Sequence, residues 1–385
     1  MDFVETEERT ALRKAVAELG KKYGPEYYTR KARAGEHTGE LWAEAGRLGY
    51  LGVNVPEEYG GGGAGIGDLA AVCEEFCAAG TPMLLMVVSP AICATVIARF
   101  GTEEQKKHWL PRFAGGEVKM SFGITEPDAG SNAHKITTTG RRDGGDWILS
   151  GRKVFISGVD EADAVLIVGR TEDAKTGKLK PALYIVPTDA PGFEYQKIEM
   201  DLVSADHQFS LFLDDVRLPA DALVGSEDAA IAQLFAGLNP ERIMGASFSL
   251  GIARYALDKG VQYAKERSVW GAPIGSHQGL AHPLAQIKIE LELAKLMTQK
   301  AAARYDSGDD FGAGEAANMA KYAGAEVAIK AVDQAVQVHG GNGLASEYGL
   351  GALLSAVRVG RIAPVSREMV LNFVAQHSLG LPKSY

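Results

Sequence analysis

The stretch Met120–Ser131, which reads MSFGITEPDAGS, carries side chains that could hold a ligand. Ahead of Glu126 every side chain is apolar or a small hydroxyl, so the segment does not suit a solvated surface strand. An extended segment of this kind can lie flat against a large planar molecule, to which Ser121, Thr125 and Ser131 would offer short hydrogen-bonding groups. Taken alone, the stretch is more typical of a strand that ends in an ordinary Pro–Asp turn.

A second predicted strand, Lys153–Gly158, favours the ligand-binding interpretation, because it places Phe155 two residues before Ser157. ITEPDAGSN together with GRKVFISG resembles the acyl-CoA dehydrogenase superfamily of flavoproteins, whose usual forms are TEPxAGSD and GxKxWITN. The resemblance covers nearly the whole chain. In that family the two strands form the floor and wall of the FAD pocket. The resemblance implies hydrogen bonds from Thr125 and Ser157 to the isoalloxazine ring and a contact between Ser131 and the CoA arm. Three apolar side chains would pack on the ring: Phe122, Ile124 and Phe155.

Members of this family dehydrogenate an acyl-CoA between its α and β carbons, which requires a strong and well-placed base. A carboxylate removes the weakly acidic α proton, while the β hydrogen passes as hydride to flavin N5. In most members the base is the Glu of a C-terminal I-Y-E-G-T-S segment. The matching segment here is Ile362–Arg367, in which Pro364 stands at the Glu position. Proline cannot take a proton, and it lacks the N–H group that helps to polarise the thioester carbonyl in relatives.

The dipeptide Glu241–Arg242, in LNPERIMGA, offers a carboxylate elsewhere. It resembles the L-x-x-E-R of isovaleryl-CoA and long-chain acyl-CoA dehydrogenases, which carry the base near the start of the first C-terminal helix. We therefore predict that Glu241 is the base. Arg242 is expected near the substrate, tying the base region to the loop around Pro364. Ala363 replaces a Tyr that flanks the acyl chain in straight-chain enzymes, which favours a branched or bulky acyl group.

The Glu241 carboxyl group is expected to experience two opposing effects. A position in the first turn of a helix lowers the pKa of a carboxyl group, and it also favours Glu there without any catalytic role. Burial under an apolar acyl chain raises the pKa. The sequence does not decide between the two effects. We predict that substrate binding, by excluding water, raises the Glu241 pKa toward the working pH.

Two further clusters resemble cofactor contacts that relatives receive from a neighbouring subunit. Arg267, Trp270 and Gln278 match the R-x-x-F-G…Q segment that reaches the flavin diphosphate and adenine. A second motif, Q-x-x-G-G-N-G, is matched by Gln337, Gly340 and Gly341. His339, within that motif, is expected to be an ordinary helix-end residue. The resemblance implies an oligomer, usually a homotetramer built as a dimer of dimers.

Composition restricts the classes of partner. With 385 residues, 46% of them hydrophobic, the chain is long enough for two or three domains. The net charge of −9 argues against nucleic acid and anionic membranes as partners. Neither a signal-peptide pattern nor an apolar run of membrane-spanning length stands out, so we expect a cytoplasmic protein. The three cysteines are interpreted as buried thiols rather than a metal site, and no metal ion is predicted: Cys73, Cys77 and Cys93.

Hydrophobic periodicity predicts three regions. Helical spacing over residues 1–118 indicates an N-terminal α-helical domain, in which Gly24–Pro25 would end the first helix and Thr102 would open another through a capping box with Gln105. Short alternating strands over residues 119–226 indicate a middle antiparallel β-barrel or sandwich. Helical spacing over residues 227–385 indicates a C-terminal four-helix bundle, with Asn239–Pro240 as a cap and helix start.

The leading hypothesis is an FAD-dependent acyl-CoA dehydrogenase of fatty acid β-oxidation that passes electrons to an electron-transfer flavoprotein. One alternative keeps the flavin but acts on an acyl or aminoacyl carrier protein. It stays open because Val203–His207 replaces the R-x-S segment that lies near the substrate or cofactor in relatives. Another alternative, prompted by Pro364, is a non-catalytic subunit of a heteromeric acyl-CoA dehydrogenase.

Overall fold

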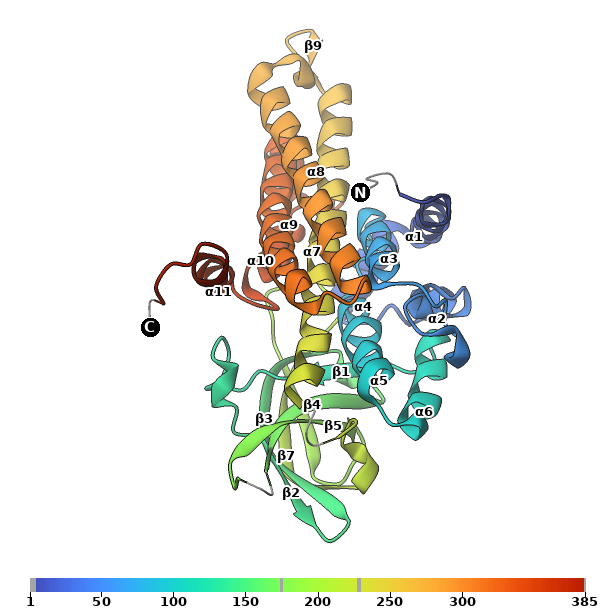
Figure 1. Ribbon diagram of the computed structural model, residues 1–385. Helices are drawn as coiled ribbons and strands as arrows, with labels where there is room; N and C mark the ends of the chain where they lie inside the picture. Colours follow the sequence, from blue (N-terminus) through green and yellow to red (C-terminus); the bar gives the residue numbers. More distant parts are fainter. Residues whose placement is uncertain (1–4, 174–175, 227–229, 384–385) are drawn as a thin grey trace.

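The computed structural model of the chain describes residues 5–173, 176–226 and 230–383. Helices occupy both ends of the sequence and a β-sheet lies between them, which confirms the predicted fold class (Figure 1). A long helical bundle stands above the sheet, and the N-terminal helices lie along one side of both. The boundary predicted between residues 226 and 227 falls at the edge of a described range.

The N-terminal helices are α1 (Glu7–Ala34), α2 (Gly39–Arg47), α3 (Ile66–Ala78), α4 (Leu85–Val88), α5 (Thr95–Phe100) and α6 (Glu103–Ala114). The predicted capping box is confirmed, since Thr102 and Gln105 each bond the other's backbone N–H through their side chains. The predicted helix end at Gly24–Pro25 is confirmed in part, because Gly24 has a non-helical backbone (φ 77°, ψ 171°) and two helical segments meet at this kink within the range of α1. A π-helical stretch, Ser89–Ala94, separates α4 from α5.

The strands are β1 (Met120–Gly123), β2 (Thr139–Asp143), β3 (Asp146–Ser157), β4 (Ala164–Glu172), β5 (Leu179–Pro187), β6 (Phe193–Ile198) and β7 (Gln208–Leu218). They form one sheet in the order β1-β4-β2-β3-β7-β6, with β5 also paired to β4. Most neighbours are antiparallel as predicted, but β1 runs parallel to β4. Strand β3 pairs with β7 through two register shifts, the second of which spans Phe155.

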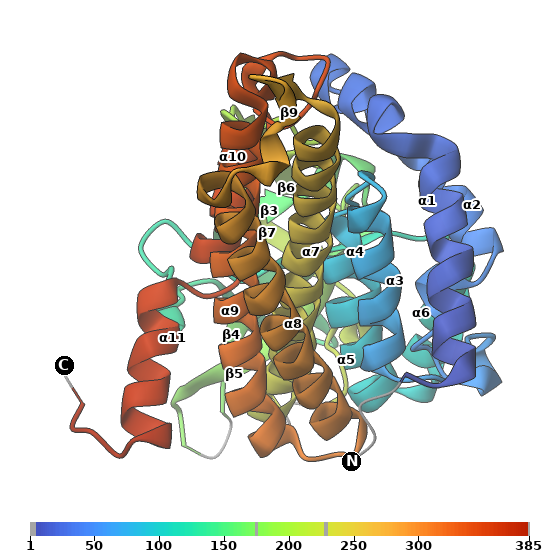
Figure 2. The same ribbon diagram turned by 90° about the horizontal axis from the view of Figure 1, so that it is seen from above.

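The C-terminal region consists of α7 (Ala230–Glu266), the hairpin β8 (Ser268–Val269) and β9 (Ala272–Pro273), α8 (Gln278–Asp306), α9 (Asp310–His339), α10 (Leu353–Ile362) and α11 (Arg367–Phe373). Helices α7 to α10 form the bundle, and α11 stands apart from it (Figure 2). Close approach of α7 to α3 depends on Gly251, where a Cβ atom would lie 2.4 Å from the Cβ atom of Cys77. Among the described residues no helix is long and apolar enough to cross a membrane.

The helix start predicted at Asn239–Pro240 is wrong. Helix α7 begins at Ala230 and runs through Pro240 without ending. The Asn239 side chain does not cap this helix but donates a hydrogen bond to the Asp310 carbonyl at the start of α9 (3.0 Å). The local signal was therefore overridden by a tertiary contact between two helices of the bundle.

A buried ion pair between Lys153 and Glu126 joins β3 to the turn after β1. Lys153 Nζ donates to Glu126 Oε1 (2.9 Å) and to the carbonyls of Ile124 (3.0 Å) and Val168 (2.6 Å). The Glu126 carboxylate also accepts hydrogen bonds from the backbone and hydroxyl groups of Thr137 and Thr138. Although burial opposes ionisation of Glu126, these bonds outweigh it and lower the pKa of the carboxyl group to about 2.

We expect Lys153→Met to reduce the free energy of unfolding by about 3–5 kcal/mol, because it leaves the Glu126 carboxylate buried without a cation. The matched control is Lys22→Met, which removes an ion pair with Glu44 in which the lysine side chain is 61% exposed. That change should cost less than about 1 kcal/mol. Urea denaturation followed by circular dichroism measures both values, and equal losses would contradict a special role for the buried pair.

Candidate active site

Glu241 lies on α7 with its side chain half-buried. Burial disfavours the ionised carboxylate and raises the pKa of Glu241 to about 7, which the positive charges of Arg242 and Lys321 oppose only in part. The residue stands about three turns inside α7, well beyond the reach of the helix N-terminus. The expected first-turn position is therefore wrong, and burial decides the direction of the shift.

The tail segment Ile362–Arg367 lies against the same part of α7. A Cβ atom added to Gly245, one turn after Glu241, would lie 3.5 Å from Cδ of Pro364. Lys321, on α9, donates a hydrogen bond to the carbonyl of Val365 in that segment. Lys321 is buried, and this burial lowers its pKa to about 8. Helices α7 and α9 and the tail segment thus meet beside Glu241.

Cys93 connects Glu241 to strand β1. The buried thiol, in the π-helical stretch, contacts the carbonyl oxygens of Met120 (3.7 Å) and Ser121 (3.6 Å). Burial, and after it the charge of Glu241, raises the pKa of Cys93 well above its usual range. Glu241 therefore lies close enough to Cys93 to act on it electrostatically, and Cys93 in turn contacts the first strand of the sheet.

The Arg242 guanidinium group is largely enclosed in the same region. Its Nη1 atom donates a hydrogen bond to the Leu238 carbonyl within α7 (2.9 Å). Its Nε atom is buried and has no hydrogen-bond partner among the described residues. Burial lowers the pKa of Arg242, and Glu241 opposes that shift. The bond to the loop around Pro364, which we expected from Arg242, comes instead from Lys321.

The two predicted ligand-binding segments lie next to each other. Ser121 Oγ donates to the Ser157 carbonyl (2.8 Å), and Val154 N–H donates to the Thr125 carbonyl (3.0 Å). The Ser157 hydroxyl oxygen accepts a hydrogen bond from Nε2 of Gln208 (2.9 Å). Thr125 and Ser157 are both half-buried.

Phe155 is the exception among the apolar residues of β3. Its ring is 57% exposed, whereas its neighbour Ile156 is buried, and its backbone adopts a left-handed conformation with φ 57°. Such a conformation is costly for an aromatic residue and is found at functional sites. Phe122 is buried, and Ile124 packs partly buried against the same apolar cluster. An exposed ring beside half-buried hydroxyl groups fits a planar heteroaromatic ligand such as a flavin.

Comparison with known proteins decides the family. Models of acyl-CoA dehydrogenases match the chain in three parts: the N-terminal domain at residues 6–117, the middle domain at 121–216 and the C-terminal domain at 231–379. The chain belongs to the acyl-CoA dehydrogenase family. Over 383 residues it is 70% identical to acyl-CoA dehydrogenase FadE12 of Mycobacterium tuberculosis, and the match covers 100% of this chain and 99% of that protein.

Solved structures of related enzymes have the same fold as this acyl-CoA dehydrogenase. A glutaryl-coenzyme A dehydrogenase in complex with glutaryl-CoA superposes with a TM-score of 0.93 at 29% identity, covering 100% of this chain and 98% of the other. A glutaryl-CoA dehydrogenase of Mycobacterium smegmatis in complex with FADH2 superposes with a TM-score of 0.90 at 27% identity, covering 99% and 96%.

The remaining cofactor residues predicted for this acyl-CoA dehydrogenase lie at the other end of the bundle. Tyr263 on α7 stacks on His339 on α9 with ring centroids 4.1 Å apart, which brings the ends of these two helices together. The motif that begins at Arg267 and the motif that begins at Gln337 both lie at this end, beside the hairpin β8–β9 and far from the sheet (Figure 1). All six residues are exposed, Trp270 at 91%. Within one chain six of the predicted cofactor residues are therefore separate from Phe155: Arg267, Trp270, Gln278, Gln337, Gly340 and Gly341.

Sequence reasoning missed Lys321 as a neighbour of the site. A signal existed, because Lys321 interrupts the small apolar residues of α9 on a face that spacing predicts to be buried. Ser131 and Ala363, predicted near the substrate, are both exposed. The three cysteines are buried thiols as predicted. His339 also fits its prediction, since its Nδ1 atom bonds the Ala335 carbonyl one turn back (2.7 Å).

We expect the stability of Glu241→Gln to rise relative to the wild type as the pH increases from about 4.5 to about 7. In this window the unfolded chain has lost the Glu241 proton that the folded chain keeps, so wild-type stability falls with pH while the variant lacks this loss. Above about pH 7 the gain in the free energy of unfolding of the variant, relative to the wild type, should reach about 3 kcal/mol. Denaturant unfolding of both proteins across the window measures it, and a pH-independent offset would contradict the raised pKa.

Proposed function

We propose that this enzyme dehydrogenates an acyl-CoA thioester between its α and β carbons, with Glu241 as the base that removes the α proton. The observation that carries this proposal is the Glu241 carboxyl group itself. It is half-buried, its pKa is raised to about 7, and it lies where α7, α9 and the tail segment meet. A general base is most effective when its pKa lies near the working pH.

The surroundings of Glu241 suit this task. Burial limits the access of water, so that the carboxylate is weakly solvated and basic. Arg242 and Lys321 keep the ionised form accessible near neutral pH through their positive charges. Pro364 has neither a carboxylate nor an N–H group to offer. The Nε–H group of Arg242, which has no partner in the described part of the chain, is a donor on this side of the site, and this supports its placement near the substrate.

The residues on β1, in the segment just after it and on β3 fit FAD as the cofactor. Thr125 and Ser157 would hydrogen-bond its isoalloxazine ring, and Phe122, Ile124 and Phe155 would pack around it, with the exposed face of Phe155 best placed to do so. When bound, FAD accepts the β hydrogen together with its electron pair. An electron-transfer flavoprotein is the proposed acceptor of these electrons, on the basis of the family resemblance.

A second copy of the chain completes the proposed cofactor site. The exposed cluster at the far end of the bundle cannot reach Phe155 of its own chain, so we assign it to the FAD of a neighbouring subunit: Arg267, Trp270, Gln278, Gln337, Gly340 and Gly341. An aromatic ring as exposed as Trp270 gains stability when a partner covers it. A homotetramer built as a dimer of dimers satisfies this arrangement. Ser131 and Ala363 would lie along the CoA arm and the acyl chain, and exposed Ala363 leaves room for bulk.

We expect Glu241→Gln to slow flavin reduction by acyl-CoA by about 10²–10⁴-fold, because an amide cannot take the α proton. Anaerobic bleaching of the flavin absorbance by a panel of acyl-CoAs measures this rate, and the FAD content of the variant should stay near that of the wild type. The matched control is Glu368→Gln, since Glu368 is an exposed carboxylate just after the tail segment. Loss of reduction in the control and not in Glu241→Gln would overturn the assignment.

The pH dependence of the same reaction gives an independent check. Because Glu241 must be ionised to accept a proton, the rate of flavin reduction at low substrate should rise as the pH increases through about 7. At saturating substrate the midpoint should move to higher pH, because the acyl chain excludes further water from the carboxylate. Stopped-flow reduction at both substrate levels measures the two profiles. A midpoint near the ordinary pKa of glutamate in both would contradict the proposal.

A further inference from the structure

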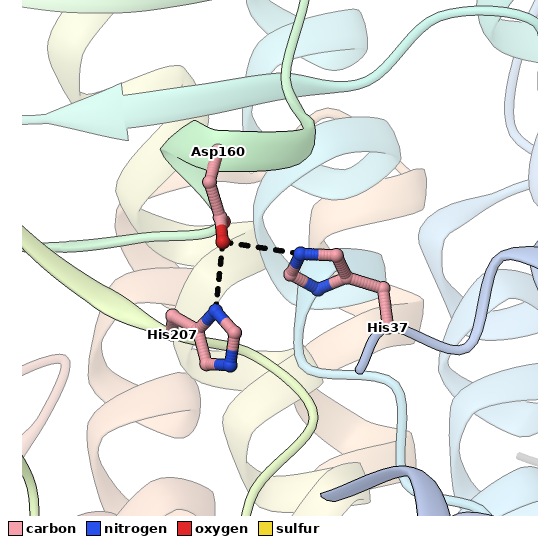
Figure 3. A group of neighbouring side chains, drawn as sticks. All are labelled: His37, Asp160 and His207. Carbon is pink, nitrogen blue, oxygen red and sulfur yellow. Dashed lines mark hydrogen bonds and ion pairs between the residues drawn. The ribbon is translucent and has the colours of Figure 1, made fainter. Parts of the chain in front are cut away.

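Two histidines and an aspartate from three separate segments converge outside the candidate active site (Figure 3). His37 belongs to the connection between α1 and α2, Asp160 to the 3₁₀ turn that follows β3, and His207 to the segment that leads into β7. Asp160 Oδ2 lies 3.1 Å from Nε2 of His37 and 2.7 Å from Nδ1 of His207. One ligand atom from each residue lies within 4.8 Å of the other two.

The His37 ring is oriented as a metal-binding imidazole would be. Its Nδ1 atom lies 3.0 Å from the Ala205 carbonyl, which leaves Nε2 directed at Asp160. Histidine ligands of metal ions commonly fix their second ring nitrogen against a carbonyl or carboxylate in this way. The His207 ring lies beside the His37 ring, with centroids 4.8 Å apart.

The chemistry of the three atoms selects the class of ion. Two imidazole nitrogens and one carboxylate oxygen form a donor set that suits Zn²⁺ and its neighbours in the transition series better than Mg²⁺ or Ca²⁺. In a tetrahedral zinc site, bonds of about 2.0–2.1 Å place the ligand atoms about 3.3 Å apart. The present nitrogen–oxygen separations of 3.1 and 2.7 Å require only small outward shifts to reach that spacing.

The site is accessible to an ion, and the neighbouring carboxylates Glu161 and Asp206 already have other partners. The three side chains are between 10% and 27% exposed, which leaves a path for an ion. Glu161 lies 3.6 Å from His37 Nδ1 but is paired with Lys119. Asp206 turns inward, where its carboxylate accepts a hydrogen bond from Leu84 N–H.

We propose that a divalent transition-metal ion of the zinc class binds between His37, Asp160 and His207, with a fourth position open to water. The ion would replace the protons that now join the two imidazoles to Asp160. It would also link the connection between α1 and α2 to the sheet next to the predicted flavin-binding strand, because Asp160 follows Ser157 by three residues and His207 adjoins Gln208. This inference does not depend on the role of Glu241.

Titration of the FAD-loaded enzyme with Co²⁺, after treatment with a chelator, tests the site directly. Tetrahedral Co²⁺ absorbs at longer wavelengths than oxidised flavin, so a new visible band should appear and saturate, and Zn²⁺ should abolish it. Asp160 raises the pKa of His37 to about 9, so a proton competes with the metal and the titration belongs at mildly alkaline pH. No band in the wild-type protein at excess Co²⁺ would overturn the proposal, whatever the variants do.

Variants identify the ligands. Asp160→Asn and His207→Gln should each weaken Co²⁺ binding at least about tenfold, whereas His282→Gln, on the exposed surface of α8, should not. Added Zn²⁺ should raise the midpoint of thermal unfolding of the wild type and of His282→Gln, and leave that of the two ligand variants unchanged. Equal Co²⁺ affinity in all four proteins would place the metal elsewhere and contradict the proposal.

Discussion

Desolvation of one carboxyl group is the constraint on which the candidate active site depends. Glu241 stands inside a long helix, against the tail segment and near the thiol of Cys93, where water can solvate its charge only poorly. The positive charges of Arg242 and Lys321 limit the resulting rise in pKa, so that the group titrates at about 7 instead of remaining neutral. Lys321 has a second function, because it also holds the Val365 carbonyl. The protonation of the base and the position of the tail segment are thus coupled through one lysine.

A second buried carboxylate shows how the same chain produces the opposite outcome. Glu126 is more buried than Glu241, yet its pKa is lowered to about 2. The difference lies in direct hydrogen bonds, because Glu126 accepts them from Lys153, Thr137 and Thr138. Arg242 and Lys321 act on Glu241 through charge alone. A saturated carboxylate is structural and holds β1 to β3, whereas a carboxylate without such bonds keeps the capacity to accept a proton.

Local sequence patterns were sufficient for the fold and for part of the site. The capping box at Thr102 and the alternating strands act through neighbours in the sequence, and both were predicted. The helix start at Asn239–Pro240 failed because Asn239 bonds α9, a contact with no local signature. Strand β6 lacks a sequence signal of its own, because most of its residues are exposed and do not alternate between apolar and polar. Motifs placed Phe155 and Ser157 on one strand, but the exposure and left-handed backbone of Phe155 appear only in three dimensions. His37, Asp160 and His207 lie far apart in the sequence, so only the fold could bring them together.

The exposure of two large aromatic rings is the physical observation behind the proposal that a second chain completes the cofactor site. Phe155 and Trp270 each adopt a left-handed backbone conformation, which costs of order 1–3 kcal/mol for a residue with a side chain. Each also leaves most of its ring in water, where it gains nothing from burial. In an isolated chain, both residues combine a left-handed backbone with an aromatic ring that is exposed to water. The positive φ of Trp270 belongs to the two-residue turn between β8 and β9, whereas coverage of both rings by a ligand or a partner would recover the free energy of burial. Because Trp270 lies at the hairpin end of the bundle and Phe155 on the sheet, the dimer proposed above would pair the two rings of different chains by symmetry.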